Sequence, residues 1–371
     1  MTKHLFAACV IITLILSLAD ATLANDEKAE GQPGEKTERS LAVHPEATVT
    51  LCVASGTLKV RGWEKSEIRV RSTDAVQIDF RRIDRTKDTS QPATRVDVMV
   101  TEKRPAPTPR RDCQALANVE MELPSGATVQ VQTRDGDILI AGVAGAYAGS
   151  QNGDIAIEHV TKLVEAGSVG GSISLRDSSG RVNLSSAGGG VEVFNVRAAT
   201  EEDTFEVGTV SGDIQLDRVS TPKVIAKTVS GTLIMTGPLA KQGNYGFTNM
   251  TGNVVLAMPN DSSFKLNAKV SGKHVIVSDF PLKYLSEPPP PPPAAAARKS
   301  AEAKPKPPMV KDKPEKEKAL PGTGPVVEPI MIEKPRVVVP YVLVRVTAVC
   351  GSGDANISVA SFGGTVRLKK I

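Results

Sequence analysis

The sequence contains few aromatic residues, and this shortage limits the kind of surface that it can present. Phe, Trp and Tyr make up 4% of the 371 residues, and there is a single Trp. A surface built from many aromatic platforms, on which sugars or bases could stack, is therefore not expected. The formal net charge of +4 is also small, and it does not predict binding to nucleic acid.

Residues and motifs that carry common catalytic chemistry are scarce as well. Apart from His4, the histidines are His44, His159 and His274, which lie far apart in the sequence. The sequence has no Gly-x-Ser-x-Gly elbow, no phosphate-binding loop and no His-Glu-x-x-His stretch. We therefore expect no catalytic residue, no cofactor and no metal site, although β-helix enzymes assemble their sites from several rungs and need no local motif.

Only four cysteines occur, and Cys9 lies in the N-terminal apolar run. Cys52, Cys113 and Cys350 remain, and no two of them have the spacing of a zinc finger. Cys52 and Cys113 are the preferred disulfide pair, because both lie in predicted N-terminal strands and an exported compartment permits the bond. The alternative is that all three are small buried apolar residues.

The N-terminus has the pattern of a secretory signal over residues 1–24. Lys3 and His4 precede an apolar run from Leu5 to Leu18, and small residues follow. Cleavage near Ala21 or Ala24 would export the chain to the periplasm, the cell surface or the medium. An uncleaved anchor is the alternative, but the run is short for a membrane span, and no other stretch could span a bilayer. Residues 25–44 are predicted to be disordered.

What the chain does have is a short phrase that recurs from residue 134 to residue 256. A small polar residue and Gly, often with Asp, are followed by alternating apolar residues, as in Asp135-Gly-Asp-Ile-Leu-Ile140. The lead glycines, which open each repeat, are Gly136, Gly153, Gly171, Gly189, Gly212, Gly231 and Gly252. They are 17 to 23 residues apart, and repeats of this length indicate a stacked array.

Each repeat has the pattern of two short strands joined by tight turns. Ile138 and Ile140 point to one side and Leu139 to the other, because side chains alternate along a strand. Stacked repeats would align these apolar residues as a core, with Gly where the chain turns sharply or stacks closely. The prediction is an all-β, single-stack, β-helix-like solenoid over residues 45–286, with two-strand repeats of about 18–20 residues. Thr133, Thr209 and Thr228 would form a ladder between rungs.

The composition changes abruptly at residues 287–338, which are rich in Pro and Lys. Six prolines run from Pro288 to Pro293, and few apolar residues follow that could form a core. This insertion is predicted to be disordered or polyproline II, either as an arm for a partner or as a tolerated loop. Residues 339–371 alternate again and are too few to fold alone, so they should close the end of the solenoid.

A row of carboxylates is the one pattern that could indicate chemistry. Asp137, Asp154 and Asp213 follow lead glycines, and a sugar lyase or hydrolase could use such a row. Equivalent positions elsewhere hold Ser172, Gly190, Thr232 and Asn253, which is typical of turns.

The ordered motifs resemble a bacterial "putative adhesin" β-strand repeat family, a domain of unknown function with Ser-Gly-Asp-Ile repeats. Ser55 to Trp63 resembles its opening hairpin, Leu123 to Val129 its entry to the repeats, and Gly351 to Asp354 its closing phrase. The resemblance implies a β-strand solenoid and surface adhesion, and it implies no catalytic residues.

These patterns favour an exported, non-catalytic solenoid that binds or scaffolds at the cell envelope. Its partner would be an envelope polysaccharide or a surface protein, held by many weak contacts along the stacked strands. Exposed residues such as Gln215, Asp217 and Arg218 are generic contact candidates. The alternatives are a carbohydrate-active β-helix enzyme and a self-assembling structural protein of the envelope.

Overall fold

The computed structural model describes residues 37–84, 90–103, 113–271, 276–285 and 343–371. All of these ranges belong to one compact unit that extends from Glu35 to Ile371. The predicted signal peptide at 1–24 and the insertion at 287–338 lie outside the described residues, and so do residues 25–36.

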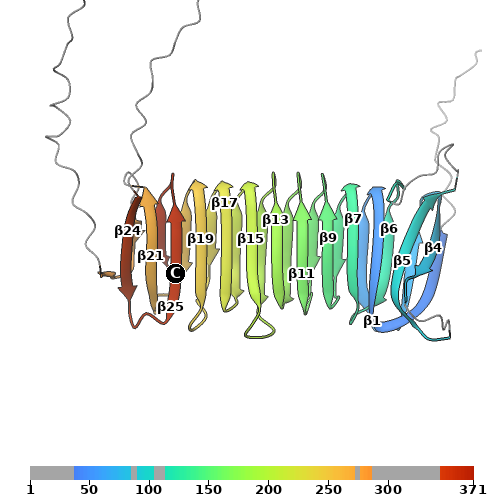
Figure 1. Cartoon of the computed structure of the whole chain (residues 1–371), viewed down its shortest axis with the longest axis horizontal. Coiled ribbons are helices and arrows are strands. Elements are labelled where there is room, and N and C mark those ends of the chain that lie inside the picture. The colour runs from blue at the N-terminus through green and yellow to red at the C-terminus, as the bar shows by residue number, and fades with distance from the viewer. Residues whose placement is uncertain (1–36, 85–89, 104–112, 272–275, 286–342) are drawn as a thin grey trace, which may run out of the picture. The chain divides into compact units, whose positions relative to one another are not determined.

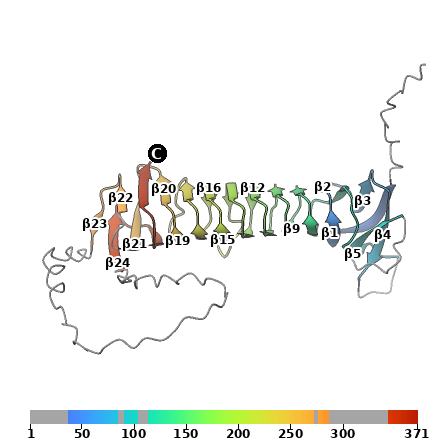
Figure 2. The same cartoon turned by 90° about the horizontal axis from the view of Figure 1, so that it is seen from above.

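Every regular element in the described ranges is a β-strand, and the strands form two layers that lie back to back (Figures 1 and 2). In spatial order, sheet A contains β3 (Glu67–Ser72), β6 (Val119–Pro124), β2 (Leu58–Trp63), β8 (Ile138–Ala141), β10 (Ile155–Glu158), β12 (Ile173–Ser179), β14 (Val191–Arg197), β16 (Ile214–Ser220), β18 (Leu233–Thr236), β20 (Val254–Met258), β26 (Val366–Lys370) and β22 (Ile276–Ser278).

Sheet B contains, in spatial order, β4 (Val76–Arg82), β5 (Ala93–Glu102), β1 (Thr37–Ser55), β7 (Thr128–Asp135), β9 (Gly145–Ser150), β11 (Leu163–Ser168), β13 (Arg181–Ser186), β15 (Thr204–Ser211), β17 (Lys223–Ser230), β19 (Asn244–Thr251), β25 (Ala355–Ser361), β21 (Phe264–Ser271), β24 (Leu343–Cys350) and β23 (Lys283–Tyr284). The long strand β1 belongs to both sheets, because its first residues pair with β3 in sheet A.

One strand from each sheet makes a rung, and neighbouring rungs pair in parallel and in register. Ile138 lies beside Ile155, and Ile155 lies beside Ile173. These side chains are buried, whereas Leu139, one residue after Ile138, is exposed on the outer face. The inward apolar residues of both sheets therefore form one core along the stack, as two packed layers require.

The lead glycines lie in a single column where each rung passes from sheet B to sheet A. A methyl group on Gly153 would overlap the carbonyl oxygen of Gly136, and one on Gly171 would overlap that of Gly153. The same holds along the column, and Gly56 and Gly364 extend it at its two ends. Close stacking of backbones is thus the common reason for Gly at this position.

A buried polar side chain lies three residues before the lead glycine of each central rung. The Oγ of Ser168 donates to the Gly153 carbonyl at 3.2 Å and accepts from the Gly171 amide at 2.9 Å. Thr209, Thr228 and Asn249 make similar bonds to glycine carbonyls. The predicted threonine ladder therefore also contains Ser and Asn, and its bonded hydroxyls donate to backbone carbonyls and not to one another. The buried Thr133 hydroxyl has no hydrogen-bond partner.

A second column of turns lies six residues after the lead glycines. Here the backbone adopts positive φ at Gly142, His159, Asp177, Asn195, Arg218 and Gly237. Gly, Asn, Asp and His are the residues that most readily tolerate this conformation. Gly142, His159 and Gly237 directly follow β8, β10 and β18, whereas Asp177, Asn195 and Arg218 lie inside β12, β14 and β16. The column therefore bends the chain at the end of each sheet A strand or within it, and His159 occupies one of these bends.

The N-terminal end of the described chain differs from the prediction in where it begins. β1 starts at Thr37 and pairs with β3 over residues 37–42. The prediction of disorder over residues 25–44 was therefore wrong for residues 37–44. The rung formed by β1 and β2 is also not terminal, because it lies between the β5–β6 rung and the β7–β8 rung. The antiparallel strands β3 and β4 cover that end and occupy pairing sites that would otherwise be open.

The C-terminal end shows the same interleaving, which corrects the prediction of a closing last rung. β25 and β26 lie between the β19–β20 rung and the β21–β22 rung. Beyond the β21–β22 rung, β24 pairs antiparallel with β21 on one side and with β23 on the other. Within the predicted closing segment 339–371, the described residues 343–371 therefore fill an internal rung as well as covering an end.

Candidate functional site

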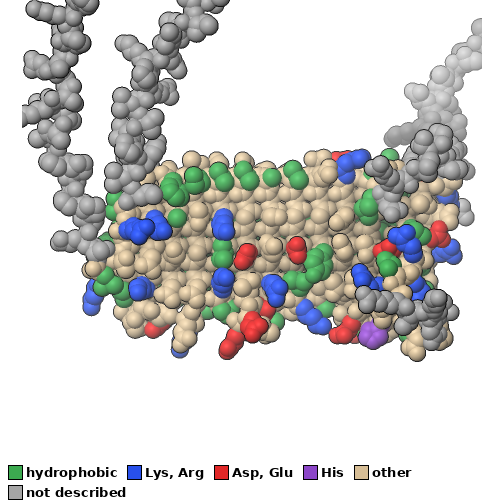
Figure 3. All heavy atoms as spheres, in the orientation of Figure 1, with side chains coloured by type: hydrophobic (Ala, Val, Ile, Leu, Met, Phe, Trp, Pro, Cys, Tyr) green, Lys and Arg blue, Asp and Glu red, His purple; other side chains and the backbone are tan. Residues whose placement is uncertain are grey.

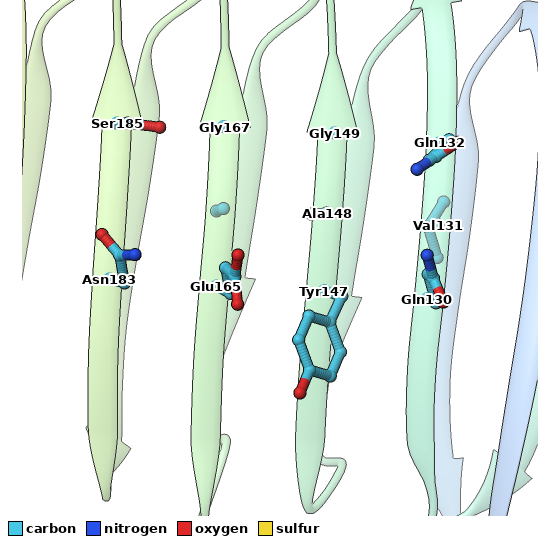
Figure 4. Close-up of a pocket in the computed structure, with 11 residues that line it drawn as sticks. Gln130, Val131, Gln132, Tyr147, Ala148, Gly149, Glu165, Gly167, Asn183 and Ser185 are labelled. Atoms are coloured by element: carbon cyan, nitrogen blue, oxygen red, sulfur yellow. The ribbon is translucent and has the colours of Figure 1, made fainter.

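A shallow groove of about 290 Å³ crosses the outer face of sheet B over strands β7, β9, β11 and β13. Strand register aligns its residues in two rows, as Figure 4 shows. One row holds Gln130, Tyr147, Glu165 and Asn183, and the other holds Gln132, Gly149, Gly167 and Ser185.

The two glycines form the floor of this groove. Because Gly149 and Gly167 have no side chain, they leave a depression beside the larger groups of the neighbouring row. A methyl group on Gly149 would meet only the Gln132 side chain, at 3.8 Å. Gly149 is therefore not required by backbone stacking, unlike the lead glycines.

The polar groups of the groove are free to bind a ligand. The side chains of Gln130, Gln132, Glu165 and Asn183 are exposed and form no hydrogen bond with another described residue. Tyr147 is half-buried, and its ring lies along its own strand with the hydroxyl pointing away from Gly149 (Figure 4). Together they offer amide donors, amide and carboxylate acceptors, and one aromatic face.

The carboxylates after the lead glycines have a structural role at the turns. Asp137 accepts the backbone N–H of Asp154 at 3.0 Å, and Asp154 accepts that of Ser172 at 2.7 Å. Asp213 accepts the backbone N–H of Thr232 at 2.6 Å, and its rung is separated from that of Asp154 by two others. Each carboxylate thus ties its rung to the next rung.

The neighbouring Asp135 is held by side chains instead of by the backbone. It accepts hydrogen bonds from Arg134 at 2.7 Å and from Asn152 at 2.6 Å. These two bonds, with Arg134 contributing most, lower the pKa of the Asp135 carboxyl. No group of three or more potential metal-ligating side chains exists among the described residues.

The other residues singled out from the sequence are dispersed. His44 accepts the Glu46 amide, His159 lies in the turn column, and His274 falls outside the described residues. A disulfide joins Cys52 to Cys113, while Cys350 is a buried free thiol.

Gln215, Asp217 and Arg218 lie on the opposite face, on sheet A, and not in the groove. The Arg218 guanidinium stacks over the Phe194 ring, 4.0 Å from its centroid. Gln215 and Asp217 line a small hollow beside the same ring.

Sequence reasoning did not single out the groove residues. Gly149 and Gly167 occupy equivalent positions four residues before a lead glycine, and Tyr147 lies two residues before Gly149. A second glycine at a fixed offset was the available signal for a depression on the face. The described residues contain no helix that is long and apolar enough to cross a membrane.

Comparison with known protein families gives a match that covers most of the repeats. The model of the Toastrack DUF4097 family matches residues 64–275. No curated protein matches the sequence.

Several solved structures share a distant likeness with the chain. A "putative adhesin" from Parabacteroides merdae is 11% identical, with 61% of this chain and 90% of that chain covered and a TM-score of 0.39. A "putative cell adhesion protein" from Clostridium sporogenes is 8% identical, with 91% and 100% covered and a TM-score of 0.21. A "putative lipid binding protein" from Parabacteroides distasonis is 15% identical, with 61% and 90% covered and a TM-score of 0.38.

Proposed function

The chain belongs to the Toastrack DUF4097 family, and we propose that this member is an exported, non-catalytic protein that binds carbohydrate chains of the bacterial cell envelope. The binding site would be the groove on sheet B. Export is supported by the signal pattern of residues 1–24.

The observation that carries this proposal is the row of unbonded polar groups beside Tyr147. Amide and carboxylate groups such as those of Asn183, Gln130 and Glu165 can exchange hydrogen bonds with sugar hydroxyls. The Tyr147 ring supplies an apolar face for one sugar ring, so a single aromatic residue suffices where a platform of several is absent. Adjacent strands repeat every 4.8 Å or so, which presents these groups in a line to an extended chain.

Weak contacts in such a groove would add up along a polymer. The groove is shallow, so one sugar unit would be held only loosely, whereas a chain that contacts several rungs binds through effective concentration. This is the behaviour expected of an adhesin-like protein that retains a polymer without enclosing it.

The openness of the groove favours binding over hydrolysis. Glu165 and Glu206 lie in one row with Asn183 between them, so their strands are about 10 Å apart. A hydrolase with two carboxyl groups places its acid in apolar surroundings, but both of these side chains are exposed to solvent. We therefore propose that bound glycans are released unchanged.

The test is retention of purified mature protein on envelope polysaccharides and on a glycan panel, with product analysis of the same samples. Tyr147→Ala should weaken binding about fivefold to tenfold, because the aromatic contact contributes about 1 to 1.4 kcal/mol. Phe194→Ala on sheet A is the matched control and should bind like the wild type.

Three results would argue against the proposal. Saturable binding that Tyr147→Ala leaves unchanged would move the site elsewhere, and released oligosaccharides would favour an enzyme. No binding, together with concentration-dependent filaments in light scattering, would favour a self-assembling structural protein.

A further inference from the structure

Charge is distributed unevenly between the two ends of the stack. In the described residues from Val219 to Ile371 there are ten Lys and Arg and three Asp and Glu. In the described residues from Thr37 to Arg218 there are 16 basic and 24 acidic residues. The small net charge of the whole chain therefore conceals an acidic part and a basic end.

Half of the basic residues at this end are aligned on the outer face of sheet B. Strand register places Lys227, Lys269 and Arg345 in one row and Lys223 and Lys265 in another. All five side chains are exposed. Figure 3 shows basic side chains over these strands, on the left of the face.

The residues between the two rows are mostly small and uncharged, and we call this strip with its two rims the basic trough. Its floor consists of Ile225, Gly246, Ser358, Asn267 and Thr347, one from each of β17, β19, β25, β21 and β24. No Asp or Glu faces outward from these five strands. The trough runs across the strands, along the direction in which the rungs stack.

The cations of the trough have no anionic partner within the described chain. None of the five forms a salt bridge with a described carboxylate, whereas Arg69, Arg71 and Arg81 at the other end each do. Lys269 and Arg345 are direct cross-strand neighbours, an arrangement of like charges that destabilises a sheet. A polyanion lying between the rows would remove this repulsion.

We propose that the basic trough binds a linear acidic polysaccharide through its carboxylate or sulfate groups. The two rows are four residues apart along each strand, about 13 Å, which leaves room for one extended chain between them. No aromatic side chain faces outward from these strands. Bases would therefore have nothing on which to stack, and an acidic glycan fits this face better than a single-stranded nucleic acid.

The trough continues the rows of the sheet B groove. Asn183 lies beside Glu206, and Glu206 lies beside Ile225 of the trough floor. The inference rests on the proposed function and deepens it by assigning acidic groups to the part of the polymer that lies in the trough, because the exposed carboxylates of Glu165 and Glu206 would repel such groups in the groove. It can still fail separately, because the trough and the groove share no residue.

The test measures binding of the mature protein to polygalacturonate, to neutral dextran and to a single-stranded DNA oligonucleotide. Lys227→Gln, Lys269→Gln and Arg345→Gln are combined in one variant. Lys241→Gln, Arg367→Gln and Lys369→Gln form the control, which loses the same charge away from the trough. We expect the trough variant to bind polygalacturonate about tenfold more weakly and the control to bind nearly as the wild type, because contact with the polymer is local.

The wild-type affinity should also fall between about 0.05 M and 0.5 M salt, since exposed charges are screened. Three results would overturn the inference. The trough variant and the control could lose equal affinity for polygalacturonate, salt could leave the binding unchanged, or DNA could bind more tightly than polygalacturonate. Thermal melting shows whether each variant is folded. Tyr147→Ala separates the two proposals, because it tests the groove while leaving every trough cation in place.

Discussion

A methyl group at a lead glycine would overlap the backbone of the preceding rung, whereas a methyl group on the outer face would meet little. Gly171→Ala would bring its new carbon against the Gly153 carbonyl. We expect this change to lower the free energy of unfolding by at least about 2 kcal/mol, because the backbones must move apart. Chemical denaturation measures the effect.

Gly149→Ala is the matched control for that change. Its methyl group would lie 3.8 Å from the nearest side-chain atom, on the floor of the groove. The free energy of unfolding should stay within about 0.5 kcal/mol of the wild-type value. Similar losses in both variants would show that close stacking is not the reason for the lead glycines.

The buried ladder of polar side chains offers a second comparison at the residue scale, between a threonine whose hydroxyl is hydrogen-bonded and one whose hydroxyl is not. Thr228 donates to the Gly212 carbonyl at 3.1 Å, whereas the Thr133 hydroxyl has no partner. Thr228→Val should cost about 1 kcal/mol, because it leaves a buried carbonyl without its donor. Thr133→Val should be neutral or stabilising, since it replaces an unbonded hydroxyl with a methyl group. The reverse order in thermal melting would contradict this account.

At the scale of elements, the disulfide ties β1 to the segment that leads into β6. Cys52 and Cys113 are 61 residues apart in the sequence, and β2 to β5 lie between them. A cross-link over a loop of this length restricts the unfolded chain and is worth about 4 kcal/mol. We expect Cys52→Ala with Cys113→Ala to destabilise the N-terminal rungs by up to this amount.

A reductant provides the comparison for the disulfide. It should lower the stability of the wild type and of Cys350→Ala by similar amounts, because Cys350 is a free thiol. It should leave the Cys52→Ala, Cys113→Ala double variant unchanged. A reductant response in the double variant would mean that another cysteine reaction is responsible.

For the whole molecule, the internal rung formed by β25 and β26 should be required for the stability of the C-terminal end of the stack. A chain without residues 343–371 would lose β24, β25 and β26 and leave β21 and β22 without their partners. We expect this truncated chain to bind a dye that reports exposed apolar surface and to melt at a lower temperature.

Complementation tests the cause of that loss. A separate peptide of residues 343–371 should restore the melting temperature by filling the open strand positions. A truncated chain that melts like the wild type, without added peptide, would show that the internal rung is dispensable.

The sequence by itself determined the local pattern of each rung. The recurring glycines and the alternation of residues such as Ile138 and Ile140 predicted strands, the inward side and an all-β stacked solenoid. This was possible because strand alternation and sharp turns depend on residues close together in the chain. The carboxylates after the glycines were also predicted as turn residues, and they bond to the backbone of the next rung.

Only the tertiary structure decided which rungs are neighbours. The chain order does not reveal that the β1–β2 rung and the β25–β26 rung are internal rungs near the two ends of the stack. Any apolar strand pair could stack at these positions. Tyr147 meets Glu165, and Lys269 meets Arg345, through this pairing between rungs. The groove and the basic trough could therefore not be predicted, because each exists only where strands distant in the sequence lie side by side.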